Sequence, residues 1–159
     1  MKTGDILACS SDRLISKLIK SFTKSSYSHV ALIVIIQEEQ YVIEMQKEGC
    51  ELISFNNWLK KYNYKYEIYQ SPITIPVKKL LNLASVTKYD LRSLLLRQPI
   101  KIIKELLFNK SIILNKVKNE NSKMTCSEFV AFIHNFQPYY DLTPDDVVNE
   151  CKKLNYIKL

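Results

Sequence analysis

Runs of apolar residues rich in β-branched side chains dominate the first half of the chain. The longest, residues 29–36 (HVALIVII), is continuously apolar after its histidine, which predicts a buried strand. The polar stretch 37–39 that follows predicts a turn, and the apolar run at 41–45 (YVIEM) predicts the second strand of a hairpin. Shorter runs of the same kind predict three further strands, at residues 4–9, 50–54 and 66–70.

Helical spacing marks other segments of the chain. Apolar residues at 14, 15, 18, 19 and 22 form one stripe, and a short helix is expected around 56–62. Pro76 suits the first turn of a helix that would run to about Tyr89.

The last part of the chain continues the helical pattern. Thr125 is the expected cap of a helix over 126–135, and the segment TPDDV begins a last short helix. Residues 155–159 (NYIKL) are expected to end the chain as a strand. The order of elements predicts an α+β fold, with antiparallel strands in the middle of the chain and helices toward both ends.

The composition limits the kinds of protein that this chain can be. Its 159 residues have the length of one domain, so we expect residues 1–159 to fold as a single unit. With Gly4 and Gly49 as its only glycines, the chain cannot build a glycine-rich phosphate-binding loop. No stretch approaches the ~20 apolar residues needed to span a bilayer. The N-terminus also lacks the pattern of a signal peptide, although a mature form whose leader was removed would look the same.

Cysteine usage and charge add two expectations. The four cysteines contain no CxxC pair, which argues against a zinc ribbon. In a chain without a leader, reduced thiols and a cytoplasmic location are expected. The net charge of +7 is concentrated at 91–123, where eight basic residues stand against two acidic ones.

This basic stretch predicts a helical insertion or lid at about 91–123. Its apolar positions favour one or two amphipathic helices around Pro99. Such a segment is usually a solvated face, but a basic amphipathic helix also suits an anionic membrane surface, which makes peripheral membrane contact through residues 92–118 an alternative. No nucleic-acid partner is expected, because the chain has no recognised nucleic-acid motif and few aromatic residues interleave with these lysines.

Cys126 is the candidate nucleophile. It follows the expected cap Thr125, and the unpaired N–H groups and dipole at the start of a helix favour the thiolate. The N–H of Cys126 is also available to bind a developing oxyanion. His134 lies eight residues further along the same helix, ~12 Å away at 1.5 Å per residue, so it cannot meet the sulfur and is expected at the surface or the helix end.

The hairpin register connects the other histidine with a carboxylate. If Gln37 and Glu38 form a two-residue turn, Ala31 lies opposite Glu44, and His29 becomes a diagonal neighbour of Glu44 on the same face. A carboxylate inside the apolar run 41–45 needs a partner. The sequence therefore permits a relay in which Glu44 holds His29, His29 moves the proton and Cys126 attacks, but it does not force this arrangement.

Six short motifs, in this order, resemble one enzyme family. They are GDIL at 4–7, SHVALIV at 28–34, VIEM at 42–45 followed by Gly49, Tyr89-Asp90, TCSEFV at 125–130 and LTPDDV at 142–147. Together they resemble the circularly permuted papain-like enzymes of the NlpC and lecithin:retinol acyltransferase superfamily, with a YiiX-like branch as the nearest in pattern. In that family the histidine comes first, the acidic or polar residue next and the cysteine last.

The resemblance implies a small antiparallel sheet or barrel packed against helices. It also implies cleavage or transfer at an amide, ester or thioester of a peptide or lipid-acyl substrate through an acyl-cysteine, with no cofactor or metal. Tyr27 and Tyr89 are candidates for lining the substrate cleft, although aromatic residues in so tyrosine-rich a chain are more often core. The alternative to an enzyme is an inert binding module that docks on membrane lipid or an acidic partner through its basic segment. Cys9, Cys50 and Cys151 are expected to be core or incidental residues.

Overall fold

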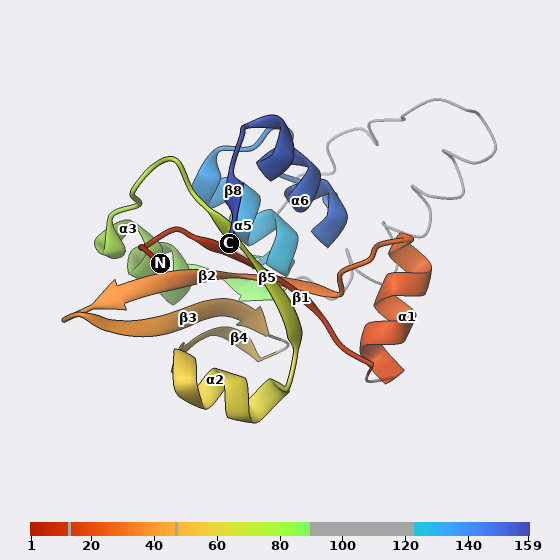
Figure 1. The fold of residues 1–159 in the computed structure, drawn as a ribbon, viewed down its shortest axis with the longest axis horizontal. Helices are drawn as coiled ribbons and strands as arrows, with labels where there is room; N and C mark the ends of the chain where they lie inside the picture. The colour runs from red at the N-terminus through yellow and green to blue at the C-terminus, as the bar shows by residue number, and fades with distance from the viewer. Residues whose placement is uncertain (13, 47, 90–122) are drawn as a thin grey trace.

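One antiparallel sheet forms the centre of the protein (Figure 1). The computed structural model describes residues 1–12, 14–46, 48–89 and 123–159. The strands of the sheet follow the order β4-β3-β2-β1-β5-β8, and every neighbouring pair is antiparallel. Their bounds are β1 Ile6–Ser10, β2 His29–Ile36, β3 Glu39–Gln46, β4 Gly49–Ser54, β5 Lys65–Gln70 and β8 Ile157–Lys158.

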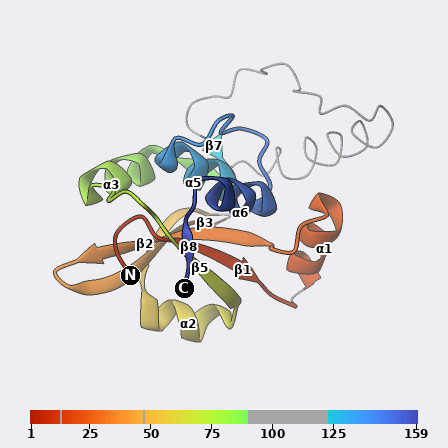
Figure 2. The same ribbon diagram turned by 45° about the horizontal axis from the view of Figure 1, so that its top comes forward.

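Helices cover both faces of the sheet. The larger apolar cluster lies on the face under α3, α5 and α6, and the smaller cluster lies on the opposite face under α2, around the fully buried Trp58 (Figure 2). A further helix, α1, connects β1 to β2 beside the sheet (Figure 1). The predicted α+β architecture is confirmed. The helices span Leu14–Thr23 (α1), Phe55–Tyr62 (α2), Val77–Val86 (α3), Cys126–His134 (α5) and Pro144–Lys153 (α6).

The hairpin of β2 and β3 has the predicted register. Ile36 pairs with Glu39, and the pairing continues back to Leu32 opposite Ile43. Gln37 and Glu38 have φ values of 50° and 68°. Two successive positive φ values identify the tight turn whose twist matches that of the flanking strands. Because this turn fixes the register, it also determines which face of the sheet receives Glu44.

The helix predicted from Pro76 to about Tyr89 is shorter than expected. It ends at Val86, and the following Thr87 is extended (φ −95°, ψ 132°). The Thr87 hydroxyl donates to the carbonyl of Leu83 at 2.6 Å, so its side chain satisfies a carbonyl of the last helical turn. The chain then continues as β6 (Lys88–Tyr89), which pairs in parallel with β7 (Lys123–Met124). This backbone pairing is the competing interaction that ends the helix.

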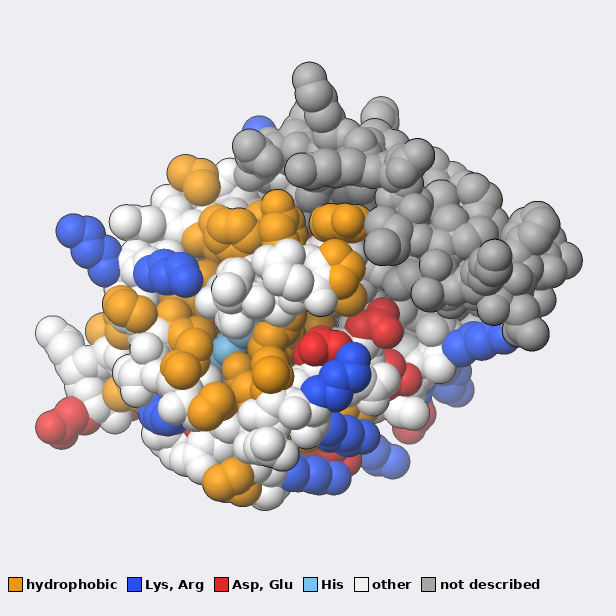
Figure 3. Space-filling view, turned by 90° about the horizontal axis from the view of Figure 1, so that it is seen from above, with side chains coloured by type: hydrophobic (Ala, Val, Ile, Leu, Met, Phe, Trp, Pro, Cys, Tyr) orange, Lys and Arg blue, Asp and Glu red, His pale blue; other side chains and the backbone are white. Residues whose placement is uncertain are grey.

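Residues 90–122, with nearly all of the predicted basic insertion, lie outside the described residues. The predicted membrane contact through residues 92–118 therefore stays a prediction. Among the helices that the structure describes, none has the length and apolarity required to cross a bilayer. In the view from above, acidic and basic side chains lie next to one another and beside hydrophobic ones (Figure 3), so the described surface on this side is not uniformly basic.

His134 is the last residue of α5, as expected for a helix-end position, but it is buried and not at the surface. Its Nδ1 lies 2.9 Å from the hydroxyl of Tyr156. Burial, followed by the charge of Lys79, lowers the pKa of His134 from 6.5 to about 4, although a backbone contact with Gly4 acts in the opposite direction. The folded protein therefore holds this imidazole neutral.

We expect His134 to make the fold sensitive to acid. Because its pKa is lower in the folded state, its contribution to stability is complete above the unfolded pKa of 6.5 and is lost as the pH falls through about 4. A pKa lowered by this much corresponds to at most about 3 kcal/mol of unfolding free energy. Urea unfolding at pH 7 and pH 4 should show a smaller acid-induced loss for His134→Gln than for the wild type. Identical losses in the two proteins would contradict this assignment.

Candidate active site

The nucleophile candidate Cys126 is the first residue of α5, and the start of this helix is firmly capped. The Thr125 hydroxyl accepts the N–H of Glu128 at 3.3 Å, and the Thr125 N–H donates to Glu128 Oε2 at 2.8 Å. The other carboxylate oxygen of Glu128 accepts the N–H of Asp141 at 3.0 Å. This capping box fixes the backbone on both sides of the cysteine. The predicted cap Thr125 is therefore confirmed.

His29 and Glu44 meet as the register predicts. His29 is the first residue of β2, lies opposite Cys9 of β1 and is 8% exposed. Its Nε2 lies 2.7 Å from Glu44 Oε2, and Glu44 is fully buried in β3. Since Nε2 is bound to the carboxylate, Nδ1 is the nitrogen left to face another group. A buried carboxylate with this partner holds both the tautomer and the orientation of the imidazole.

The surroundings of Glu44 favour its anion. Burial alone would raise the pKa of this carboxyl, but the hydrogen bond and charge of His29 outweigh it, with help from Gln46 and Trp58, so the pKa is lowered. The Gln46 amide and the Trp58 indole lie near the carboxylate without direct hydrogen-bond geometry, and among the described residues Glu44 Oε1 has no hydrogen-bond partner. The histidine is therefore the main stabilising contact of this charge.

Cys126 and His29 influence each other's ionisation. Burial opposes ionisation of the thiol, but the charge and the ring of the nearby His29 outweigh burial and lower the pKa of Cys126. The backbone of Val30 and the hydroxyl of Ser127, 4.0 Å from the sulfur, act in the same direction. Burial likewise lowers the pKa of His29, whereas Cys126 and then Glu44 raise it well above its usual range. The fold thus favours a thiolate beside an imidazolium.

The other three cysteines lack this environment. Burial raises the pKa of Cys9 well above its usual value, and the nearby charges of Glu44 and Cys126 raise it further. Burial also raises the pKa of Cys50 to about 12 and that of Cys151 to about 12. Cys9 and Cys151 are fully buried and Cys50 is half-buried. The expected core position is confirmed for Cys9 and Cys151, and Cys50 packs against the core from its half-buried position.

The two tyrosines predicted to line the cleft remain predictions in that role. The hydroxyl of Tyr27 donates to Glu67 of β5 at 2.6 Å and lies 3.4 Å from the hydroxyl of Tyr69. Tyr27 thus directs its polar end toward a carboxylate of β5. Tyr89 contributes its backbone to β6, and its side chain lies outside the described part of the structure.

Several residues of the site escaped the sequence analysis. Glu128 could have been found, because a Thr followed three residues later by Glu is a capping-box signal. Trp58 and Tyr64 gave no such signal, since their place beside His29 and Glu44 depends on how α2 packs on the sheet. Ser127 follows the nucleophile directly, and only the structure shows its hydroxyl near the sulfur.

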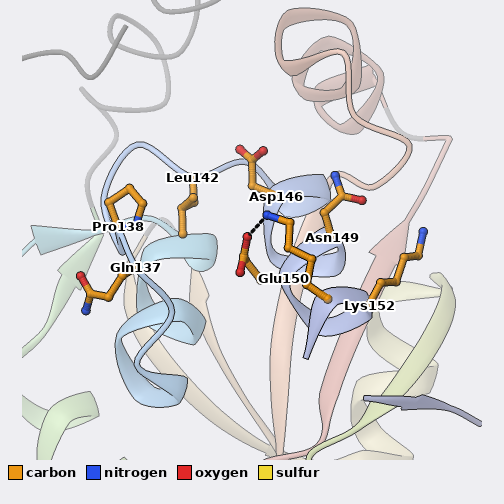
Figure 4. A pocket seen from close by; sticks show the side chains of 8 residues that line it. Gln137, Pro138, Leu142, Asp146, Asn149, Glu150 and Lys152 are labelled. Carbon is orange, nitrogen blue, oxygen red and sulfur yellow. Dashed lines mark hydrogen bonds and ion pairs between the residues drawn. The ribbon is translucent and has the colours of Figure 1, made fainter. Parts of the chain in front are cut away.

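A cavity of about 420 Å³ lies over α6, away from Cys126, His29 and Glu44. Its lining includes Leu142, Asp146 and the ion pair of Glu150 with Lys153 (Figure 4). None of Cys126, His29 and Glu44 borders it, so it is separate from the candidate catalytic centre.

Comparison with known proteins identifies the family of the chain. Residues 1–91 match the model of the family described as permuted papain-like amidase enzyme, YaeF/YiiX, C92 family. The chain belongs to this family of papain-like cysteine hydrolases. The predicted family and fold are confirmed. No curated protein was found to match the chain.

A solved structure shares the fold. It is described as metalloprotein yiiX from Escherichia coli O157:H7, with 22% sequence identity and a TM-score of 0.51. The match covers 84% of this chain but only 64% of that protein. The description of that solved structure calls it a metalloprotein. Among the described residues of this chain, no three His, Cys, Asp or Glu side chains are grouped so that they could hold a metal ion.

Proposed function

We propose that the chain hydrolyses an amide through an acyl-cysteine intermediate, with Cys126 as nucleophile, His29 as the proton carrier and Glu44 as the residue that holds His29. The observation that carries the proposal is the arrangement of these three buried side chains. His29 Nε2 lies 2.7 Å from Glu44 Oε2, and His29 and Cys126 lie close enough for each to shift the pKa of the other. Membership of a family of permuted papain-like amidases supports the choice of an amide as the scissile bond.

The reaction proceeds in two halves. The Cys126 thiolate attacks the substrate carbonyl, forming the S–C bond and a tetrahedral oxyanion, while His29 keeps the proton. The N–H of Cys126 belongs to the first turn of α5, whose amides have no carbonyl partner within the helix, and it stabilises the oxyanion. Collapse of the intermediate breaks the C–N bond, and the imidazolium gives its proton to the departing amine.

In the second half a water molecule takes the place of the amine. Neutral His29 removes a proton from the water as its oxygen attacks the thioester, and the C–S bond then breaks to release the carboxylic acid and regenerate the thiolate. An alcohol or an amine in place of water would complete an acyl transfer by the same steps. A lipid ester would enter the first half in the same way, and the imidazolium would give its proton to the departing oxygen, so that an alcohol leaves.

Active-site labelling tests the proposal and compares the substrate classes. Two electrophilic ketone probes, one with a fatty acyl chain and one with a short peptide, would be incubated with the protein, and the modified residue would be mapped by mass spectrometry. We expect labelling of Cys126, which Cys126→Ala removes and Cys50→Ala leaves intact. The probe that reacts faster identifies the acyl group that the site accepts. Absence of labelling, together with salt-sensitive binding to anionic vesicles, would favour the inert binding module.

A further inference from the structure

We propose that Tyr64 is a positioning residue of this active site, which fixes the tilt of the His29 ring between Glu44 and Cys126. The inference rests on the proposed function, because it assigns Tyr64 to the same reaction. Tyr64 lies between Asn63, the residue that caps the end of α2, and Lys65, which begins β5.

The backbone on both sides of Tyr64 is held. Asn63 adopts the left-handed conformation (φ 47°, ψ 42°), and its N–H donates to the carbonyl of Leu59 at 3.3 Å. This conformation ends the helix and redirects the chain. On the other side, Lys65 lies opposite Ser10 of β1 in the sheet. The position of Tyr64 is therefore set by a helix end and a strand start, in a segment too short to move freely.

The ring of Tyr64 stacks on the catalytic imidazole. Its centroid lies 6.1 Å from that of His29, with an angle of 23° between the planes. Two further aromatic rings support it from α2. Tyr62 stacks on it at 5.2 Å and 16°, and the fully buried Trp58 contacts it at 5.5 Å and 41°. Tyr64 thus has little freedom to leave the histidine.

The stacked ring of Tyr64 restricts a tilt of the His29 imidazole that the hydrogen bond to Glu44 does not restrict. The 2.7 Å contact between Nε2 and Glu44 Oε2 holds one edge of the imidazole and leaves the ring able to tilt about this contact. Contact with a ring face opposes this tilt and also favours the positive charge of the imidazolium. The titratable groups that surround His29 are Glu44 from β3, Cys126 from α5 and Cys9 from β1, and Cys9 stays neutral because its pKa is raised. Among the residues that the structure describes, Tyr64 is the one whose ring stacks on His29.

The test separates positioning from a general loss of stability. Tyr64→Met keeps a side chain of similar length without the ring. We expect kcat to fall roughly tenfold or more with little change in KM, as for a general base held less well. We also expect the pH midpoint of Cys126 alkylation by iodoacetamide, followed by mass spectrometry, to rise, because a misplaced imidazolium stabilises the thiolate less. Tyr64→Phe should restore both values.

Matched controls make each outcome decisive. Tyr66 lies two residues after Tyr64, and its ring contacts Trp58 at 5.7 Å. Tyr66→Met removes this ring and should leave the alkylation profile unchanged. A second ring-free variant, Tyr64→Leu, guards against a folding defect specific to methionine. A wild-type profile in both ring-free variants, or failure of Tyr64→Phe to restore it, would overturn the role of Tyr64. An ordinary thiol profile in the wild type would instead overturn the proposed function.

Discussion

Replacing Cys126 by alanine is expected to lower the turnover of an amide substrate by at least about a thousandfold, because removal of a nucleophile eliminates the covalent pathway. Without the sulfur there is no acyl intermediate, and His29 loses the nearby thiol that raises its pKa. Turnover would be followed as release of a chromogenic amine from the acyl amide that the labelling experiment favours.

The fold should survive this change. Cys126 is 7% exposed at the start of α5, and alanine keeps the backbone and the N–H that the capping box positions. Loss of one buried sulfur is expected to cost about 1 kcal/mol, by analogy with the removal of a small buried group. Circular dichroism and thermal unfolding would establish that the variant is folded.

Two further variants complete the experiment. Cys126→Ser should be nearly as inactive as the alanine variant, because a hydroxyl is far less acidic than a thiol and His29 cannot ionise it at rest. Cys50→Ala removes a half-buried thiol of β4 and should retain activity within about threefold, as expected for a side chain outside the reacting group. Wild-type turnover by a folded Cys126→Ala protein would rule out the acyl-cysteine mechanism.

Local signals in the sequence were sufficient for the parts of the site that depend on short stretches. The strand His29–Ile36 has the predicted bounds, because its continuous β-branched run leaves no competing helical pattern. The two-residue turn at Gln37 and Glu38 then fixed the register that brings His29 to Glu44. Thr125 likewise marked the start of α5 through its capping side chain.

Such local signals could not predict contacts between segments that are distant in the sequence. The parallel pair of β6 and β7 joins Tyr89 to Met124, and two-residue strands carry no periodic pattern. The stacking of Tyr64 on His29 and the place of Trp58 near Glu44 depend on how α2 packs on the sheet. Burial of His134 depends on Tyr156, which lies 22 residues further along the chain. In each case the sequence shows the residue type but not the partner.

Replacing Glu44 by glutamine should give the second large loss, roughly a hundredfold or more in kcat, in line with the usual contribution of a positioned acid–base system. Glutamine keeps the shape of the side chain, and its carbonyl can accept the Nε2–H of His29, but the charge is removed. Because Glu44 raises the pKa of His29, the substitution should lower that pKa and so move the alkaline limb of the pH–rate profile to lower pH. The weaker imidazolium should also raise the pKa of Cys126 and move the acidic limb to higher pH.

A neighbouring carboxylate provides the control for this charge. Glu51 of β4 lies directly opposite Glu44, but its side chain binds Lys61 at 2.6 Å and the hydroxyl of Tyr62 at 3.0 Å. Glu51→Gln removes the same charge from the next strand and should leave both limbs of the profile in place. The profile would be measured as kcat/KM from pH 4 to 10. If Glu44→Gln and Glu51→Gln gave the same profile, the carboxylate of Glu44 would act only as part of the buried sheet, and Cys126 and His29 would work without a third member.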